Sequence, residues 1–249
     1  MWLPGSGTFD QDPAGASSAL QQTTADMPSP PTGDRSANSA VPTGSPPASP
    51  SPSTGQDAVP DLLVEARSTG KFVTAAGRGP VVGNGRRVTY AVAVETGIDL
   101  APAGFAAQVQ TILGDAEGWA SQDRWSLQRT TGRTDLVVRL ATPATVDRVC
   151  ATGGLRTNGY ASCRVGQFVM VNVARWEHAI PEYDGDIDRY RHYVVNHEFG
   201  HGLGFGHNAC PGKNKPAPVM QQQTYGLDGC TPNGSPYVRG RLLTGPPAP

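Results

Sequence analysis

Apolar residues fall at every second position of the segment 88–95, "VTYAVAVE", so that one of its faces is apolar. This period of two predicts a β-strand. Three further short segments rich in apolar residues also predict strands: "WSLQR" (125–129), "DLVVRLA" (135–141) and "GQFVMVNV" (166–173). Just before the first strand, the pair Asn84-Gly85 separates two apolar runs and predicts a β-hairpin turn.

Two longer segments carry apolar residues at helical spacing. A stripe through residues 102–117 predicts a helix, and Pro102 suits its first turn, where the missing N–H is not needed. A second stripe predicts a helix over residues 186–203, with aspartates at its start, where the helix dipole is positive. The segment "TPATVDRVC" (142–150) predicts only a short helical turn.

The order strand, helix, three strands, helix predicts an α+β fold. We expect a small, twisted, mixed sheet with the two main helices packed against it. After residue 204 the chain is rich in glycine and proline and shows little periodicity. An irregular C-terminal subdomain is therefore predicted there.

Residues 1–60 differ in composition from the rest of the chain. They include "SPPTGDRSANSAVPTGSPPASPSPSTG", which has almost no large apolar side chains. Such a segment cannot bury enough surface to offset the entropy lost on ordering, so we predict a disordered linker over 1–60 and a folded domain over 61–249. The first residues have neither a basic start nor an apolar stretch, and we expect no signal peptide in this chain.

Charge and hydropathy argue against two classes of partner. The formal net charge is -1 over 249 residues, which gives no basic signal for nucleic acid. No stretch of about 18 apolar residues occurs, so we expect no transmembrane segment. We expect the chain to be a monomer.

Three of the 5 histidines fall within the segment 194–208, "VVNHEFGHGLGFGHN". His197 and His201 are four residues apart on the predicted helix, about 40° apart in direction, so both imidazoles reach one point in space. Glu198 lies about 100° from His197 and can reach a water molecule bound at that point. A carboxylate in this position can act as a general base.

Gly204 and His207 complete the arrangement. Glycine adopts positive φ without strain, so Gly204 can end the helix and turn the chain back. His207 then becomes a third ligand from a direction that a straight helix cannot offer. Three imidazoles around Zn²⁺ leave a fourth position open, as in catalytic rather than structural sites. We therefore predict one catalytic zinc ion, bound by His197, His201 and His207.

The full pattern H-E-x-x-H-x-x-G-x-x-H, here "HEFGHGLGFGH", resembles that of the metzincin zinc metallopeptidases. Metzincins also have a methionine in a tight turn after the motif, and "PAPVMQQQT" offers Met220. The resemblance implies a zincin-type domain and a zinc endopeptidase that cleaves peptides or proteins. It also implies that Met220 is a hydrophobic floor below the metal, and that Glu198 deprotonates the zinc-bound water and passes the proton to the leaving amine.

A narrower resemblance covers "RYRHYVVNHEFGHGLGFGHNACPG" and "KPAPVMQQQTYGLDGC". These segments look like the signature of an actinobacterial family of secreted domains of unknown function, and the resemblance extends more weakly from about residue 62 to 238. A membrane anchor and a Pro-rich linker usually precede that domain. The chain departs from the metzincin pattern at Gln222, where some metzincins have a tyrosine that assists the site. Tyr225 lies further on, and we expect a packed or surface tyrosine there.

Four cysteines, Cys150, Cys163, Cys210 and Cys230, permit two disulfides in three connectivities. Their spacing is unlike that of a CxxC zinc site. Local pairing is the simplest: Cys210–Cys230 would close a loop around Met220, and Cys150–Cys163 would staple a glycine-rich loop. The linker, the poorly cored C-terminal segment and the resemblance to secreted domains favour oxidised cysteines and an extracytoplasmic location, secreted or on the cell surface.

Two alternatives to a protease remain open at this point. One is a zinc-stabilised binding module without turnover, which leaves the presence of Glu198 unexplained. The other is a hydrolase of a peptide amide in the cell wall. The sequence gives no substrate preference. We expect the strand at 166–173 to form the sheet edge beside the cleft, where an extended peptide could pair as a further strand.

Overall fold

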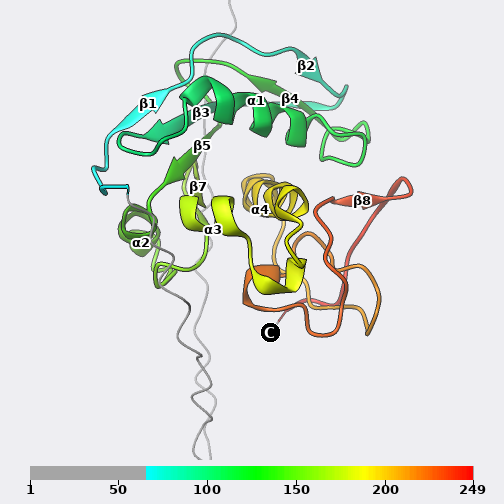
Figure 1. The fold of residues 1–249 in the computed structure, drawn as a ribbon. Helices are drawn as coiled ribbons and strands as arrows, with labels where there is room; N and C mark the ends of the chain where they lie inside the picture. The colour runs from blue at the N-terminus through cyan, green and yellow to red at the C-terminus, as the bar shows by residue number, and fades with distance from the viewer. Residues whose placement is uncertain (1–65, 249) are drawn as a thin grey trace, which may run out of the picture. The chain divides into compact units, whose positions relative to one another are not determined.

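Seven strands form one mixed sheet in the computed structural model, which describes residues 66–248 (Figure 1). They are β1 (Phe72–Thr74), β2 (Val81–Val82), β3 (Arg86–Glu95), β4 (Trp125–Arg129), β5 (Leu136–Ala141), β6 (Cys163–Val165) and β7 (Phe168–Asn172). Their order across the sheet is β2-β4-β3-β5-β7-β6, with β1 also paired to β3. Neighbours among β4, β3, β5 and β7 are parallel, whereas β1, β2 and β6 pair antiparallel with their neighbours.

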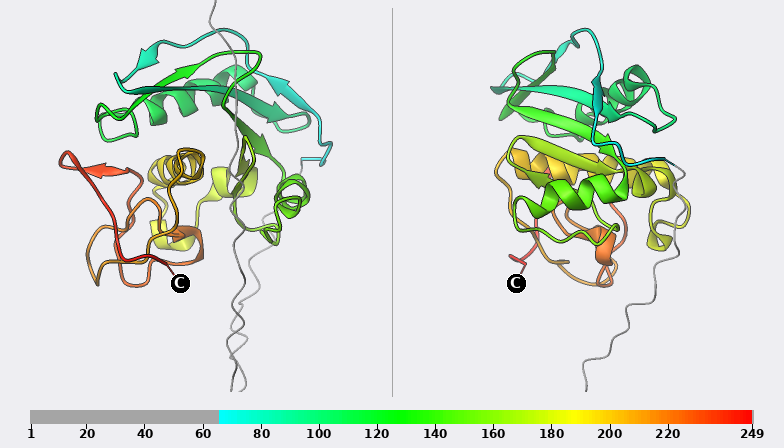
Figure 2. Two further views of the ribbon diagram at one scale, coloured as in Figure 1. Left: turned by 180° about the vertical axis from the view of Figure 1, so that it is seen from behind. Right: turned by 90° about the vertical axis from the view of Figure 1, so that its left-hand side faces the viewer.

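The described residues contain four α-helices, namely α1 (Pro102–Leu113), α2 (Pro143–Ala151), α3 (Val173–His178) and α4 (Ile187–Gly202). Apolar side chains of α1, α3 and α4 join those of β3, β5 and β7 in the main core. Helix α2 packs over a smaller core on the opposite face of the sheet. The two views of Figure 2 show this layering from behind and from the side. The predicted α+β class with a mixed sheet is thereby confirmed.

Strand β3 is buried over most of its length because it runs through the middle of the sheet. From Arg86 to Tyr90 it pairs with β4, and from Tyr90 to Val94 it pairs with β5. This stagger lets the short connection after β4 start the next parallel strand on the other side of β3. The strands predicted at 88–95, 125–129, 135–141 and 166–173 are all present, with small shifts at their ends.

The predicted hairpin at Asn84-Gly85 is wrong. Strand β2 pairs antiparallel with β4, with Val81 opposite Gln128, because β4 already occupies this side of β3. The glycine serves a close approach of two backbones instead. A Cβ at Gly85 would lie 2.1 Å from the carbonyl carbon of Arg124.

Two helices differ from their predicted lengths. Helix α1 ends at Leu113, short of the predicted residue 117. Gly114 is its cap and makes the last α-helical hydrogen bond, to the carbonyl of Gln110 at 3.0 Å, whereas the next N–H, of Asp115, donates to the carbonyl of Ile112 at 3.3 Å. Residues 143–151 form a full helix, α2, in place of the single turn that was predicted. Its first residue is Pro143, which fits a helix start because that position needs no N–H.

A buried carboxylate joins the end of β3 to the start of α2. Glu95 is 1% exposed and accepts hydrogen bonds from the backbone N–H of Gly70 (2.7 Å), the backbone N–H of Thr142 (2.8 Å) and the hydroxyl of Thr145 (2.6 Å). Burial alone would raise the pKa of Glu95, but these hydrogen bonds outweigh it and lower the pKa below its ordinary value. The charged carboxylate is therefore part of the folded structure.

After α4 the chain has little regular structure, as predicted. It contains a short 3₁₀ helix, η2 (Gln223–Tyr225), and a hairpin of β8 (Tyr237–Val238) and β9 (Arg241–Leu242). A further 3₁₀ helix, η1 (Pro181–Tyr183), lies between α3 and α4. The C-terminal subdomain must therefore be held by contacts other than backbone ladders.

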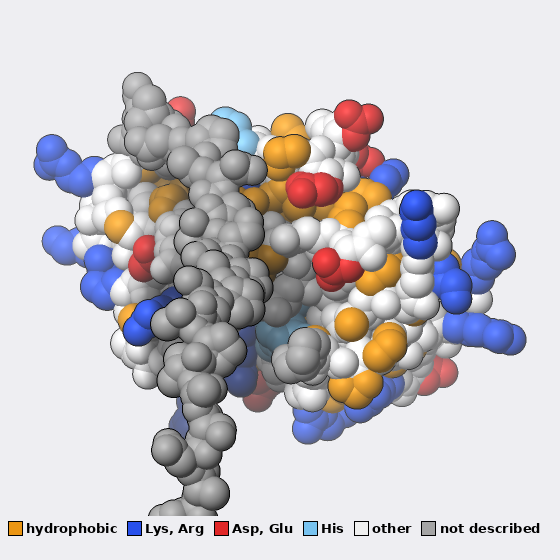
Figure 3. All heavy atoms as spheres, turned by 90° about the horizontal axis from the view of Figure 1, so that it is seen from below, with side chains coloured by type: hydrophobic (Ala, Val, Ile, Leu, Met, Phe, Trp, Pro, Cys, Tyr) orange, Lys and Arg blue, Asp and Glu red, His pale blue; other side chains and the backbone are white. Residues whose placement is uncertain are grey.

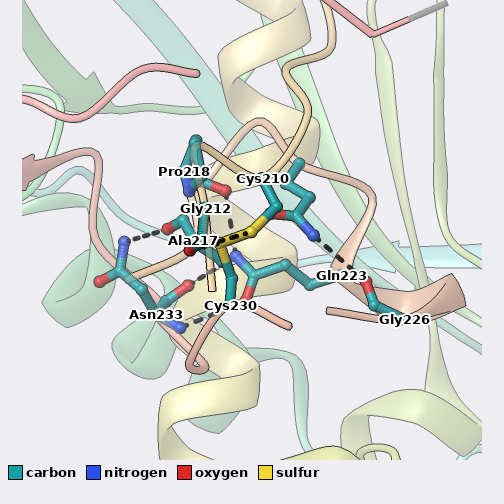
Figure 4. Close-up of a disulfide and its surroundings, with 9 residues drawn as sticks. Cys210, Gly212, Ala217, Pro218, Gln223, Gly226, Cys230 and Asn233 are labelled. Atoms are coloured by element: carbon teal, nitrogen blue, oxygen red, sulfur yellow. Dashed lines mark hydrogen bonds between the residues drawn. A yellow bond between two sulfur atoms is a disulfide. The ribbon is translucent and has the colours of Figure 1, made fainter. Parts of the chain in front are cut away.

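The Cys210–Cys230 disulfide and side-chain amides supply those contacts (Figure 4). The amide of Asn233 donates to the carbonyl of Ala217 at 2.9 Å, and that of Gln223 donates to the carbonyl of Asn233 at 2.8 Å. The other two cysteines also form a disulfide, between α2 and β6. Local pairing is thus confirmed for both disulfides.

The predicted linker over residues 1–60 and the first residues of the predicted domain lie outside the described residues. Within the part that is described, no helix is long and apolar enough to cross a membrane.

Candidate metal centre

Helix α4 carries the first part of the site and is buried along most of its length. Asp186 begins it, with its side chain accepting a hydrogen bond from the N–H of Arg189 at 3.0 Å. The helix packs against β7, α1 and α3, so the polar residues of its second half, Asn196 to Glu198, are buried as well. His197 is 4% exposed and Glu198 is 5% exposed.

The end of α4 follows the Schellman pattern. The N–H of Gly204 donates to the carbonyl of His201 at 3.1 Å, and that of Phe205 donates to the carbonyl of Gly200 at 3.0 Å. Gly204 has φ +95°, where a side chain would be strained. Phe205 then stacks on Trp119 with ring centroids 4.5 Å apart. These contacts fix the chain reversal beyond the helix, as the sequence predicted for Gly204.

The reversal brings three imidazoles together. One ring nitrogen from each of His197, His201 and His207 lies within 4.8 Å of the others, and the described residues add no further side chain to this group. The Nε2 atoms of His197 and His201 are 3.2 Å apart. Two nitrogens bound tetrahedrally to zinc at about 2.0–2.1 Å lie roughly 3.3 Å apart, so this separation fits a shared ion.

Backbone carbonyls orient two of the three rings. The Nδ1 of His197 lies 2.8 Å from the carbonyl oxygen of Val219, and that of His201 lies 2.9 Å from the carbonyl oxygen of Phe205. A carbonyl oxygen can only accept, so each Nδ1 carries the proton and each Nε2 presents a lone pair. Metal-bound histidines almost always use their second nitrogen in this way. The donor set therefore fits a metal ion.

Met220 lies in a tight turn that packs against α4. The N–H of Gln221 donates to the carbonyl of Pro218 at 2.9 Å, which closes the turn around Val219 and Met220. Met220 is 3% exposed, and a Cβ at Gly200 would lie only 2.6 Å from its Sδ. The same turn thus supplies both the apolar contact with the helix and the carbonyl that orients the first histidine.

Burial sets the protonation of the site. It raises the pKa of Glu198 to about 8, so this carboxyl group can exchange a proton near neutral pH. Burial and the neighbouring His201 lower the pKa of His197 to about 3. Burial is also the main cause that lowers the pKa values of His201 and His207. The three imidazoles are therefore neutral at pH 7, the form in which a histidine can bind a metal ion.

A cleft of about 500 Å³ opens over the histidines. Its walls come from β6 and the loop before it, from the end of α4 and the segment after it, and from η2. Figure 3 views this side of the molecule from below, and histidine atoms are visible in a hollow of the surface. Glu198, Gln222 and Tyr225 also line the cleft, and Tyr225 is 58% exposed, which agrees with the surface position expected for it.

The expected edge strand at 166–173 is wrong, because β6 covers the outer side of β7 and forms the edge beside the cleft. The disulfide between Cys150 and Cys163 ties this edge to α2. Sequence reasoning missed the wall formed by residues 155–164, including Arg156 and Arg164. A three-residue strand is too short to show a period. The disulfide expected at Cys163 could have indicated that the neighbouring Arg164 is held in a fixed position.

Three tyrosines, also missed as part of the site's support, connect α4 and η1 with η2. The hydroxyl of Tyr183 donates to the side chain of Gln223 at 2.8 Å, and the hydroxyls of Tyr190 and Thr224 are 2.9 Å apart. The backbone N–H of Thr224 donates to the hydroxyl of Tyr193 at 3.3 Å. This buried network fixes the position of η2, and with it one wall of the cleft.

Fold and site together define an α+β domain with a three-histidine candidate metal centre at the floor of an open cleft. The chain belongs to the family described as "Protein of unknown function (DUF3152)", whose sequence pattern matches residues 59–232. No curated protein and no solved structure matches the chain. Because the family description carries no activity, the function has to be argued from the site.

Proposed function

We propose that this chain is a zinc-dependent endopeptidase of the metzincin type. One observation carries the proposal: His197, which is buried, and His201, which is partly buried, each donate Nδ1–H to a backbone carbonyl, while their Nε2 atoms, 3.2 Å apart, converge with a third histidine in an open cleft. Two nitrogen lone pairs that face each other at this distance repel each other, and packing alone does not offset that repulsion. A cation bound between them would remove it.

His197, His201 and His207 would hold the ion. Three neutral imidazoles suit zinc and leave room for a further ligand, which is the donor set of a catalytic rather than a structural site. When bound, such an ion lowers the pKa of a water molecule and polarises a substrate carbonyl. The carbonyls of Val219 and Phe205 keep two of the rings in the required tautomer.

Glu198 would act as the general base and acid. It lines the cleft directly beside the first histidine, and burial raises its pKa to about 8 in the absence of a cation. This carboxylate accepts the proton of the attacking water and then passes it to the leaving amine. Met220, packed below the last turn of α4, would serve as the apolar floor that keeps the ligand helix in position.

Peptides in extended conformation are the substrates that the cleft suits best. In the sheet that the described residues form, strand β6 has a neighbour on one side only, so the backbone of its outer edge is available for pairing with a further strand. Its neighbouring residues also line the cleft. The two disulfides favour an oxidising compartment, which supports an extracytoplasmic location for this activity.

Cleavage-site profiling on a peptide library tests the proposal. Wild type and Glu198→Gln are each loaded with one equivalent of zinc, verified by metal analysis, and incubated with the library. We expect cleavage products from wild type alone, with equal zinc in both proteins. If both proteins bind zinc and neither cleaves peptides or cell-wall peptide cross-links, the chain is a zinc-stabilised binding module. If neither protein binds zinc, both the peptidase hypothesis and the binding-module hypothesis are wrong.

A further inference from the structure

Arg164 lies on the face of the sheet that points toward the histidines. Strand β6 pairs antiparallel with β7, with Arg164 opposite Val169 and Cys163 opposite Met170. Directly opposed residues share a face, and successive residues alternate. Val169 belongs to the core under α4, whereas Met170 belongs to the core under α2. The side chain of Arg164 is therefore on the α4 side, where it lines the cleft.

The guanidinium of Arg164 has no partner within residues 66–248. No ion pair or hydrogen bond involves it there, and its Nε atom is buried without an acceptor. Burying a charged donor without an acceptor is unfavourable. A second arginine of the cleft, Arg156, is exposed and makes no ion pair in the described part of the chain either.

The carboxylates that the structure describes in and near the cleft do not pair with these two arginines. Among residues 66–248, Glu198 is the only acidic residue that lines it. Asp147, on α2, accepts hydrogen bonds from the hydroxyl of Thr157 and from the N–H of Gly159, and it thereby holds the loop before β6. Apart from the three histidines, the lining therefore carries two positive side chains against one carboxyl group. A bound cation would increase this excess.

We propose that the cleft recognises a carboxylate of its ligand, which forms a bidentate pair with Arg164 and is attracted by Arg156 at the rim. The planar fork of an arginine matches two carboxylate oxygens. The exposed apolar side chains of Leu155 and Tyr225, 43% and 58% exposed, lie in the same lining and suit apolar residues that flank the acidic one. This inference rests on the proposed function: it gives the proposed peptidase a preference for peptides that present a carboxylate to the cleft.

Four matched peptides separate the two sources of such a carboxylate. They carry either Glu or Gln at one internal position and either a free or an amidated C-terminus. Their binding is measured by fluorescence anisotropy on the zinc-loaded full chain with Glu198→Gln, which prevents turnover. The same protein is prepared with Arg164→Gln, and with Arg133→Gln as a control, because Arg133 is exposed and lies outside the cleft.

We expect the internal Glu peptide, or the free C-terminus, to bind about tenfold or more tightly than its uncharged match, since hydrogen bonds to charged groups are strong. Arg164→Gln should remove that preference at unchanged zinc content, and Arg133→Gln should retain it. Equal binding of all four peptides, or a preference that survives Arg164→Gln, would overturn the inference. Cleavage by wild type without acidic preference refutes only this inference, whereas acidic preference without cleavage refutes only the peptidase.

Discussion

Removal of the Cys210–Cys230 disulfide is expected to weaken metal binding, whereas removal of Cys150–Cys163 is not. The first disulfide closes the loop that contains the Met220 turn, and the Val219 carbonyl of that turn orients His197. The second disulfide ties α2 to the sheet edge and closes no loop that carries a histidine ligand. The two pairs of cysteines therefore provide a matched comparison within one chain.

The expected losses of stability are nearly equal. The disulfides span 20 and 13 residues in sequence. Loop-closure entropy gives about 3 kcal/mol for each, because the dependence on loop length is logarithmic. Loss of a partner that orients a metal ligand, in contrast, lowers metal affinity by about tenfold or more. Only the double variant Cys210→Ser/Cys230→Ser should show both effects.

Two measurements separate these effects. Urea unfolding gives the free energy of unfolding of each double variant, and competition with a zinc chelator gives its zinc affinity under conditions where it is folded. We expect similar destabilisation in both variants and weaker zinc binding in the Cys210–Cys230 variant alone. Equal zinc affinities in the two variants would refute the claim that the disulfide-closed loop orients the site.

Three further predictions concern single residues. Gly200→Ala should destabilise the protein by about 1–3 kcal/mol in urea unfolding, because its Cβ would meet a sulfur atom at 2.6 Å, whereas Gly206→Ala has open space and should change little. Glu95→Gln should destabilise by about 1–3 kcal/mol at neutral pH. Because the folded pKa of Glu95 lies below its ordinary value, the carboxylate's contribution is full above pH 4.5 and is lost as the pH falls through the folded pKa, so the difference between the proteins should shrink in acid. His207→Ala should lower zinc affinity in a chelator competition, whereas His192→Ala, outside the cluster, should leave it unchanged.

The regular elements could be predicted from the sequence because burial imposes a period on them. The strand at 88–95 and the helix that ends just before Gly204 follow directly from apolar spacing and from glycine's tolerance of positive φ. The hairpin at Asn84-Gly85 could not be excluded in this way. Turn residues report a local bend, but the partner of a strand is decided by which edges are already occupied, and that is a property of the whole sheet.

The part of the candidate site that lies within one helix could be predicted from the sequence. His197, Glu198 and His201 share one helix, so their relative directions follow from helix geometry. The carbonyl of Val219 and the side chain of Arg164 come from segments whose approach depends on the folded chain. Neither shows a period in sequence, and both are positioned largely by tertiary contacts.

The most direct test of the central claim is a zinc titration of the metal-free protein, with cleavage of a susceptible peptide as the readout. For wild type, the rate should rise linearly and break at one equivalent of zinc. Glu198→Gln should bind the same single equivalent, with a rate about 10²–10⁴-fold lower because the general base is lost. Full activity in the absence of metal, or equal rates for the two zinc-loaded proteins, would contradict the assignment of His197, His201 and His207 as a catalytic zinc site served by Glu198.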